Sequence, residues 1–125
     1  MLVLTRKNQE SLAIGDDIRI TVVAIRGNRV SLVITAPSTL AIDRRDRGPS
    51  EQSVRIGQDV EIIMVGICRN RVRVVTIAPK YMPVRRIDLD GYVVETENVR
   101  ISMVEVLGPI MPSFGGERVD DSHRS

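Results

Sequence analysis

The chain has few of the residues that usually build chemical sites. Its 125 residues include one cysteine, one histidine, no tryptophan and only three aromatic side chains, Tyr81, Tyr92 and Phe114. A single cysteine excludes an internal disulfide, and one cysteine with one histidine supplies too few ligands for a zinc site. Three aromatic side chains are also too few for a broad platform on which single-stranded bases stack.

Long apolar runs and a strong charge bias are missing as well. No apolar stretch approaches the ~20 residues that cross a bilayer. The N-terminal MLVLTRKNQE turns polar too soon for a secretory signal. The formal net charge is only +2, although 27% of the residues are charged. The sequence therefore favours a cytosolic protein with no membrane segment and a weak preference for anionic partners.

No set of residues points to covalent chemistry. His123 lies in a polar C-terminal stretch and Cys68 in a predicted strand next to a turn, so neither forms a nucleophile–base pair. The glycine patterns of phosphate-binding loops and dinucleotide sites are absent. We therefore predict that the chain is not an enzyme and needs neither a cofactor nor a metal.

The sequence does contain apolar and polar residues in alternation. In DDIRITVVAIRGN, Ile18, Ile20 and Val22 fall on one face of an extended chain. Most of these residues are β-branched, which suits strands better than helices. Gly27 and Asn28 both tolerate positive φ and predict a hairpin turn before the next alternating run. The predicted fold class is all-β.

Two segments repeat this pattern at an offset of 42 residues. NRVSLVITAPSTLAIDRR, residues 28–45, is matched by NRVRVVTIAPKYMPVRRI, residues 70–87. The gapless agreement favours an internal duplication over two unrelated hairpins of similar composition. The predicted organisation is a first repeat at 1–46, a linker at 47–53, a second repeat without its first strand at 54–89, an extra strand or hairpin at 90–107 and a disordered tail at 108–125.

Arginines lie at the ends of several predicted strands. Arg6 follows the first apolar run, and arginine pairs at 44–45 and 85–86 end the short strands after the two Ala-Pro steps. The planar guanidinium suits phosphate groups and the acceptor edge of guanine. The alternative is that these charges only keep an edge strand soluble. The charges alone leave both interpretations open.

The first repeat resembles the carbon storage regulator family, CsrA/RsmA, which consists of small bacterial RNA-binding proteins that regulate translation. The resemblance covers residues 1–46 without a gap, and residues 54–88 resemble the same family more weakly from its second strand onward. The motifs that carry it are the opening Met-Leu-x-Leu-Thr-Arg, Glu10, Ile14-Gly15-Asp16, Gly27-Asn28, Ala36-Pro37 and Arg44.

The resemblance implies a homodimer of five-stranded chains in which the first and last strands pair with strands of the partner. It also implies an RNA site where the first strand of one chain runs beside the last strand of the other, reading GGA loops in messenger leaders. The implied RNA-binding residues are Leu4, Thr5, Arg6, Ala36, Pro37, Ile42 and Arg44, with Ala78, Pro79, Val84, Arg85 and Arg86 in the second repeat. Asp43 departs from the family pattern, where a basic or imidazole residue is usual, while Arg85 keeps that pattern.

The duplication predicts that interdigitated antiparallel sheets form within one chain, as a pseudo-dimer. One site is then complete, with residues 4–6 facing residues 84–86. At the opposite site the first strand is missing, and residues 99–104 are expected to fill the empty edge and to supply Arg100. The alternative is a true homodimer through the first repeats.

Two functions fit these observations. The first is an RNA-binding regulator of translation that recognises GGA-containing loops in messenger leaders or small regulatory RNAs. The second is a degenerate protein-interaction module that modulates a regulator partner, since the family has protein antagonists. Asp43 and the modest net charge favour the second, whereas the presence of Arg6, Arg44 and Arg86 favours the first.

Overall fold

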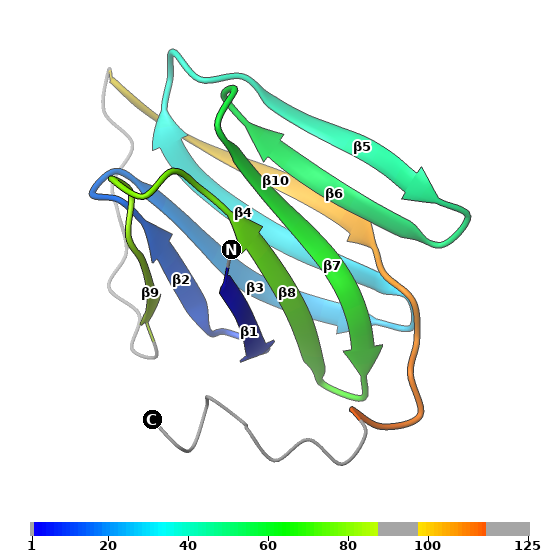
Figure 1. Ribbon diagram of the computed structural model, residues 1–125. Helices are drawn as coiled ribbons and strands as arrows, with labels where there is room; N and C mark the ends of the chain where they lie inside the picture. The colour runs from blue at the N-terminus through cyan, green and yellow to red at the C-terminus, as the bar shows by residue number, and fades with distance from the viewer. Residues whose placement is uncertain (1, 88–97, 115–125) are drawn as a thin grey trace.

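The computed structural model describes residues 2–87 and 98–114, which form two antiparallel five-stranded sheets stacked face to face (Figure 1). The strands are β1 (Leu2–Lys7), β2 (Ser11–Ile14), β3 (Ile18–Arg26), β4 (Arg29–Pro37), β5 (Ile42–Gly48), β6 (Glu51–Ile56), β7 (Val60–Cys68), β8 (Arg71–Ile77), β9 (Val84–Ile87) and β10 (Val99–Leu107). The alternation of β-branched and polar residues therefore predicted the fold class correctly, and the all-β expectation is confirmed.

Each sheet is completed by strands from the other repeat. One sheet has the order β1-β8-β7-β6-β5, and the other has the order β10-β4-β3-β2-β9. The first and fifth strands of the first repeat thus flank the second repeat, and β9 of the second repeat flanks the first. The predicted pseudo-dimer is confirmed in this respect, because the interleaving that a homodimer would share between two chains occurs within one.

Matching hydrogen-bond registers relate the two repeats by an approximate two-fold axis. Leu12 of β2 lies opposite Arg86 of β9, and the equivalent Val54 of β6 lies opposite Arg44 of β5. Both long hairpins also carry a register shift at the same place, between Val22 and Ala24 in one and between Met64 and Gly66 in the other. The duplication seen in the sequence is therefore preserved in the pairing of the strands.

The hairpin turns of the two repeats have the same backbone form with different residues. Gly27 has a φ of 60°, and Arg69 at the equivalent position has a φ of 59°. A side chain at positive φ costs about 1 kcal/mol. The paired strands on both sides of Arg69 hold it in this conformation, because the register of β7 and β8 requires the same tight turn.

The segment predicted as a linker is part of a hairpin between the repeats. β5 continues to Gly48 and pairs with β6, which begins at Glu51, so the repeats are joined by a short turn. A short connection suffices because the last strand of the first repeat lies beside the second strand of the other. On this hairpin the Ser53 hydroxyl donates to Glu61 at 2.6 Å, and this bond, with the Arg47 charge, lowers the pKa of the Glu61 carboxyl.

Strand β10 occupies the edge that the second repeat leaves empty. It pairs antiparallel with β4 from Val99 opposite Pro37 to Leu107 opposite Arg29. The expected filling of this edge by residues 99–104 is therefore observed, and the strand extends to residue 107. The rest of the predicted strand or hairpin, residues 90–97, lies outside the described residues.

Residues 108–114 continue from β10 onto the outer face of β7 and β8. The Ile67 amide donates to Pro109 O at 2.8 Å, and the Met111 amide donates to Ile67 O at 2.8 Å. The Arg73 guanidinium lies 4.3 Å from the centre of the Phe114 ring. The composition of the segment from residue 108 predicted disorder, but these contacts fix its first seven residues. Residues 115–125 lie outside the described residues.

The core lies between the inner faces of the two sheets, and both repeats contribute to it. Its largest fully buried apolar side chains are Leu12, Ile14, Ile18, Ile20, Leu32, Ile34, Ile56, Ile62, Met64 and Ile67. Val106 of β10 is fully buried with them. The two repeats therefore share one core, and neither can bury its apolar face alone.

Because the interleaving is internal, we expect the protein to be a monomer in solution. Sedimentation equilibrium or multi-angle light scattering should give a mass near 13.9 kDa. Since β10 already covers the edge of β4, the chain has no need of a second copy there. A mass twice as large at micromolar concentration would contradict this expectation and favour the homodimer.

Candidate nucleic-acid interface

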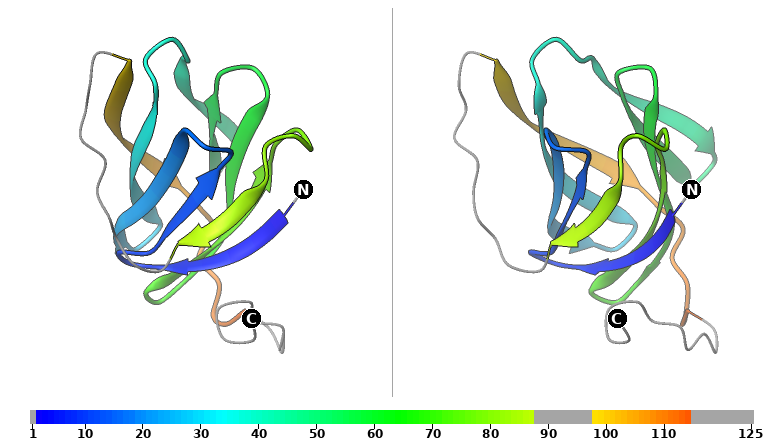
Figure 2. Two further views of the ribbon diagram at one scale, coloured as in Figure 1. Left: turned by 90° about the vertical axis from the view of Figure 1, so that its left-hand side faces the viewer. Right: turned by 60° about the vertical axis from the view of Figure 1, so that its left-hand side comes forward.

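At two equivalent places of the strand order, an edge strand of one sheet lies across from an edge strand of the other, and we refer to each place as a groove. The first groove is the one between β1 and β9 and includes the connection 78–83. The second groove is the one between β10 and β5 and includes the connection 38–41. In the second groove, Arg44 Nη1 of β5 donates to Glu105 O of β10 at 3.1 Å, across the two sheets. In both views of Figure 2, β1 and β9 lie together on the same side of the molecule.

Strand pairing decides which way the β9 side chains point. Arg86 lies opposite Leu12, and Val84 lies opposite Ile14, so both point to the inner face that carries these buried residues. Arg86 is half-buried there, at the sheet edge that faces β1. Arg85 alternates to the outer face and is exposed. The two arginines therefore present charge on opposite faces of β9.

Residues 4–6 of β1, which the resemblance assigns to RNA binding, are buried. Leu4 is 4% exposed, Thr5 is 8% and Arg6 is 1%. The Arg6 guanidinium donates from Nε to Thr5 O at 2.9 Å and from Nη1 to Ser11 O at 3.1 Å, and Nε lies 3.7 Å from Glu10 Oε1. Arg6 thus ties β1 to the start of β2. We therefore expect Arg6 to act by positioning the strand, because a side chain this buried offers no open face to a base.

The Ala-Pro steps place the fifth strand of each repeat. Pro37 O accepts the Leu40 amide at 3.0 Å, and the equivalent Pro79 O accepts the Met82 amide at 2.9 Å. Each tight turn reverses the chain so that β5 or β9 can pair with its neighbour. Ala36 is buried at the end of β4, and Ala78, Pro37 and Pro79 are half-buried. These residues therefore form the corner of each groove.

In the second groove the arginine already has an intramolecular partner. Ile42 and Arg44 lie opposite Ile56 and Val54 on the inner face of β5, as Val84 and Arg86 do on β9. A depression of about 230 Å³ at this place is lined by Arg29, Arg44, Gln52, Glu105 and Leu107. Asp43 lies on the outer face opposite Arg55. The carboxylate of Asp43 is therefore turned away from the inner face on which Arg44 lies.

Strand β10 repeats the anchoring of β1 with different side chains. Val104 lies opposite Leu32 as Leu4 lies opposite Val74, so Glu105 and Val106 occupy the places of Thr5 and Arg6. The Lys7 amide donates to Glu10 Oε1 at 2.9 Å, and the equivalent Leu107 amide donates to Gln52 Oε1 at 3.0 Å. Sequence reasoning missed Glu105, because residues 99–107 do not resemble the first strand. Arg100 lies exposed at the start of β10, opposite Ala36.

The structure therefore divides the predicted site residues between two grooves. The first groove contains Leu4, Thr5, Arg6, Ala78, Pro79, Val84, Arg85 and Arg86, and the second contains Ala36, Pro37, Ile42 and Arg44. The pairing of residues 4–6 with residues 84–86, expected from the duplication, agrees with the strand order and with the pseudo-two-fold axis.

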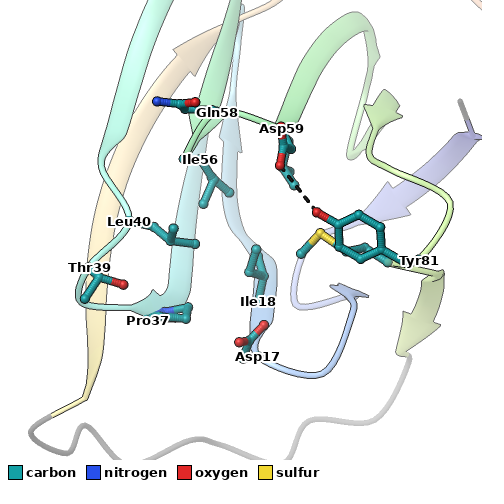
Figure 3. A pocket seen from close by; sticks show the side chains of 12 residues that line it. Asp17, Ile18, Pro37, Thr39, Leu40, Ile56, Gln58, Asp59 and Tyr81 are labelled. Atoms are coloured by element: carbon teal, nitrogen blue, oxygen red, sulfur yellow. Dashed lines mark hydrogen bonds between the residues drawn. The ribbon is translucent and has the colours of Figure 1, made fainter.

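A larger cavity of about 410 Å³ lies near the pseudo-two-fold axis, between the two connections (Figure 3). Equivalent residues of the two repeats line it, among them Asp17 with Asp59 and Leu40 with Met82. The Tyr81 hydroxyl donates to Asp59 Oδ2 at 3.4 Å. Among the described residues no basic side chain lines this cavity, so its carboxylates would repel a phosphate backbone. The grooves are therefore the better candidates for nucleic acid.

In the described ranges 2–87 and 98–114, no group of three or more His, Cys, Asp and Glu side chains could hold a metal ion. Cys68 is 7% exposed, and its thiol donates to Pro112 O at 3.6 Å, so it is a packing residue. The part of the chain that the structure describes contains no helix long and apolar enough to cross a membrane.

Comparison with known proteins gives one family. No solved structure matches the chain. The family model of CsrA, described as a global regulator protein family, matches residues 1–46. The two interleaved five-stranded sheets suggest a second unit of the same kind in the following residues. The match covers residues 1–46, which supply β1 to β4 and most of β5, so this part of the chain is similar to the CsrA family.

Proposed function

We propose that the chain binds GGA-containing loops or single-stranded segments of RNA in its first groove. By this binding it controls the translation of messengers that carry the motif in their leaders, and small regulatory RNAs with the same motif compete for the groove. The residues that we assign to binding are the β1 segment 4–6, the corner at Ala78 and Pro79, and residues 84–86 of β9.

The observation that carries this proposal is the position of the Arg86 side chain and its lack of a partner within the described residues. Its side chain points inward at the groove edge and is half-buried. Within the described residues, no hydrogen bond or ion pair engages its guanidinium. A guanidinium held in place by a strand and without an internal partner can donate two parallel hydrogen bonds to O6 and N7 of a guanine.

Strand β1 supplies the other side of the groove. It is the edge strand of its sheet, so the backbone groups on its free side are not used in pairing. Unpaired bases can bond such groups along their edges, a mode open to splayed RNA loops but not to duplex DNA. Arg85 on the outer face adds a charge for the phosphate backbone. This combination favours a short, unpaired, guanine-rich RNA segment.

The protein-interaction alternative has one observation in its favour. Glu105 stands in the second groove where Thr5 stands in the first, and its carboxylate lies 3.9 Å from Arg29. A groove with an exposed carboxylate suits a basic protein segment better than RNA. This observation concerns only one of the two grooves, and Arg86 of the first groove has no partner among the described residues. We therefore place RNA binding first.

A binding titration with a GGA stem-loop RNA tests the proposal. We expect saturable binding to the purified chain, with an affinity that falls as salt concentration rises, because phosphate contacts release counterions. A stem-loop with the GGA changed to CCU is the matched control and should bind much more weakly. Absence of binding to the GGA RNA at low salt would contradict the proposal and favour the protein-interaction alternative.

A further inference from the structure

The two grooves differ in the donor that satisfies one equivalent backbone carbonyl. In the first groove, Thr5 O accepts the Nε of Arg6 at 2.9 Å. In the second groove, the equivalent Glu105 O accepts Nη1 of Arg44 at 3.1 Å. The residue equivalent to Arg6 is Val106, whose side chain has no donor. The groove arginine therefore takes over in the second groove the role that Arg6 has in the first.

This exchange has a physical cause. An edge-strand carbonyl that points away from the paired strand lacks a partner in the sheet and gains from any donor within reach, most of all from a charged one. In β1 the donor comes from the next residue of the same strand, so Arg86 is not drawn to Thr5 O. In β10 valine cannot donate, and Arg44 reaches across the groove to fill the position. Binding RNA through Arg44 would first require breaking this hydrogen bond.

Charge adds to the difference between the grooves. Glu105 carries a carboxylate on the outer face of β10, at the rim of the second groove, where Thr5 carries a hydroxyl on β1. Its side chain is 57% exposed and lines the same depression as Arg44, so its carboxylate repels a phosphate backbone that approaches there. Both the internal hydrogen bond and the carboxylate therefore act against RNA in the second groove.

We infer that the chain is a monovalent RNA binder, with the first groove as its single RNA site and Arg6 as the positioning residue that keeps Arg86 available. This inference rests on the proposed function. It also sets a limit on regulation, because a protein with one site cannot gain avidity by bridging two motifs in the same leader. The duplicated chain thus recognises one motif at a time.

The first test is the number of RNA molecules bound per chain. Isothermal titration calorimetry and native mass spectrometry with a GGA stem-loop should give one RNA per 13.9 kDa chain. Arg44→Ala should leave that number at one. Two RNAs per chain, reduced to one by Arg44→Ala, would overturn the inference while supporting the proposed function. No binding of any RNA by the native chain would instead overturn the proposed function.

The second test concerns the role of Arg6. Arg6→Val should keep the fold, because Val106 shows that valine fits the equivalent buried position. We expect its affinity for the GGA stem-loop to fall about tenfold, as Arg86 turns to Thr5 O, and its preference for GGA over CCU to narrow. Adding Arg86→Ala to this variant should then cost little more, since both changes remove the same contact. Full affinity of a folded Arg6→Val chain, or fully additive losses, would overturn the positioning role.

The third test rebuilds the second groove. Gln52 and Ser53 occupy the places of Glu10 and Ser11, the residues around the Arg6 guanidinium. A variant with Gln52→Glu, Glu105→Thr and Val106→Arg should therefore hold an arginine at position 106 and release Arg44. We expect it to bind two RNAs per chain, and Arg44→Ala on this background should return the number to one. If the variant folds, melts as the native chain does and still binds one RNA, the inferred cause of the inactive groove is wrong.

Discussion

Replacing Arg86 with alanine is expected to weaken binding of a GGA stem-loop by about 1–3 kcal/mol, or roughly 5- to 150-fold, the range for loss of a bidentate guanine contact. The loss should be large because Arg86 is held at the inner edge of β9, opposite Leu12, and is not otherwise engaged within the described residues. Fluorescence anisotropy at one fixed salt concentration measures the change, with the CCU stem-loop as reference.

The chain contains its own matched control for this experiment. Arg44 occupies the equivalent position of β5, opposite Val54, but donates to Glu105 O. Arg44→Ala should therefore change the affinity by less than about twofold, in keeping with the small effect of most substitutions outside an interface core. If Arg44→Ala is damaging and Arg86→Ala is silent, the RNA site belongs to the second groove.

Much of the fold could be predicted because the duplication constrains strand pairing. The Asn28 and Asn70 turns fix two hairpins, and a period of two residues assigns their inner and outer faces. The missing first strand of the second repeat left an edge to be covered, which pointed to residues 99–104. The short β5–β6 turn was less predictable, since the polar stretch at 47–53 has the composition of a flexible linker.

The strands that carry the predicted site could be placed from the sequence, but the surroundings of its residues could not. The resemblance gave Arg6 as an RNA-binding residue and did not predict its burial. The sequence did contain a signal for its burial, because Arg6 lies two residues after Leu4 and so shares the inner face of β1. The hydrogen bond from Arg44 to Glu105 O depends on the register of β10, and no sequence pattern in residues 99–107 fixes that register.

Introducing a carboxylate at Val106 should produce the largest loss of stability among the changes considered. Val106 is fully buried opposite Val30, so Val106→Asp places an unpaired charge in the shared core. We expect the free energy of unfolding to fall by about 3 kcal/mol or more, a large part of the stability of a small domain. Urea denaturation followed by circular dichroism gives the midpoint and the free energy.

Met103 of the same strand provides the control. It lies on the outer face of β10 and is 68% exposed, so Met103→Asp should change the free energy of unfolding by no more than about 0.5 kcal/mol. Equal losses in the two variants would mean that β10 is sensitive to charge on either face. This would contradict the assignment of Val106 to the inner face and Met103 to the outer face. Two native-like variants would mean that β10 does not cover β4 in solution. A loss confined to Val106→Asp makes residues 99–107 a structural replacement for the missing first strand. The same strand then covers the edge of β4 and supplies the carbonyl that Arg44 bonds in the second groove.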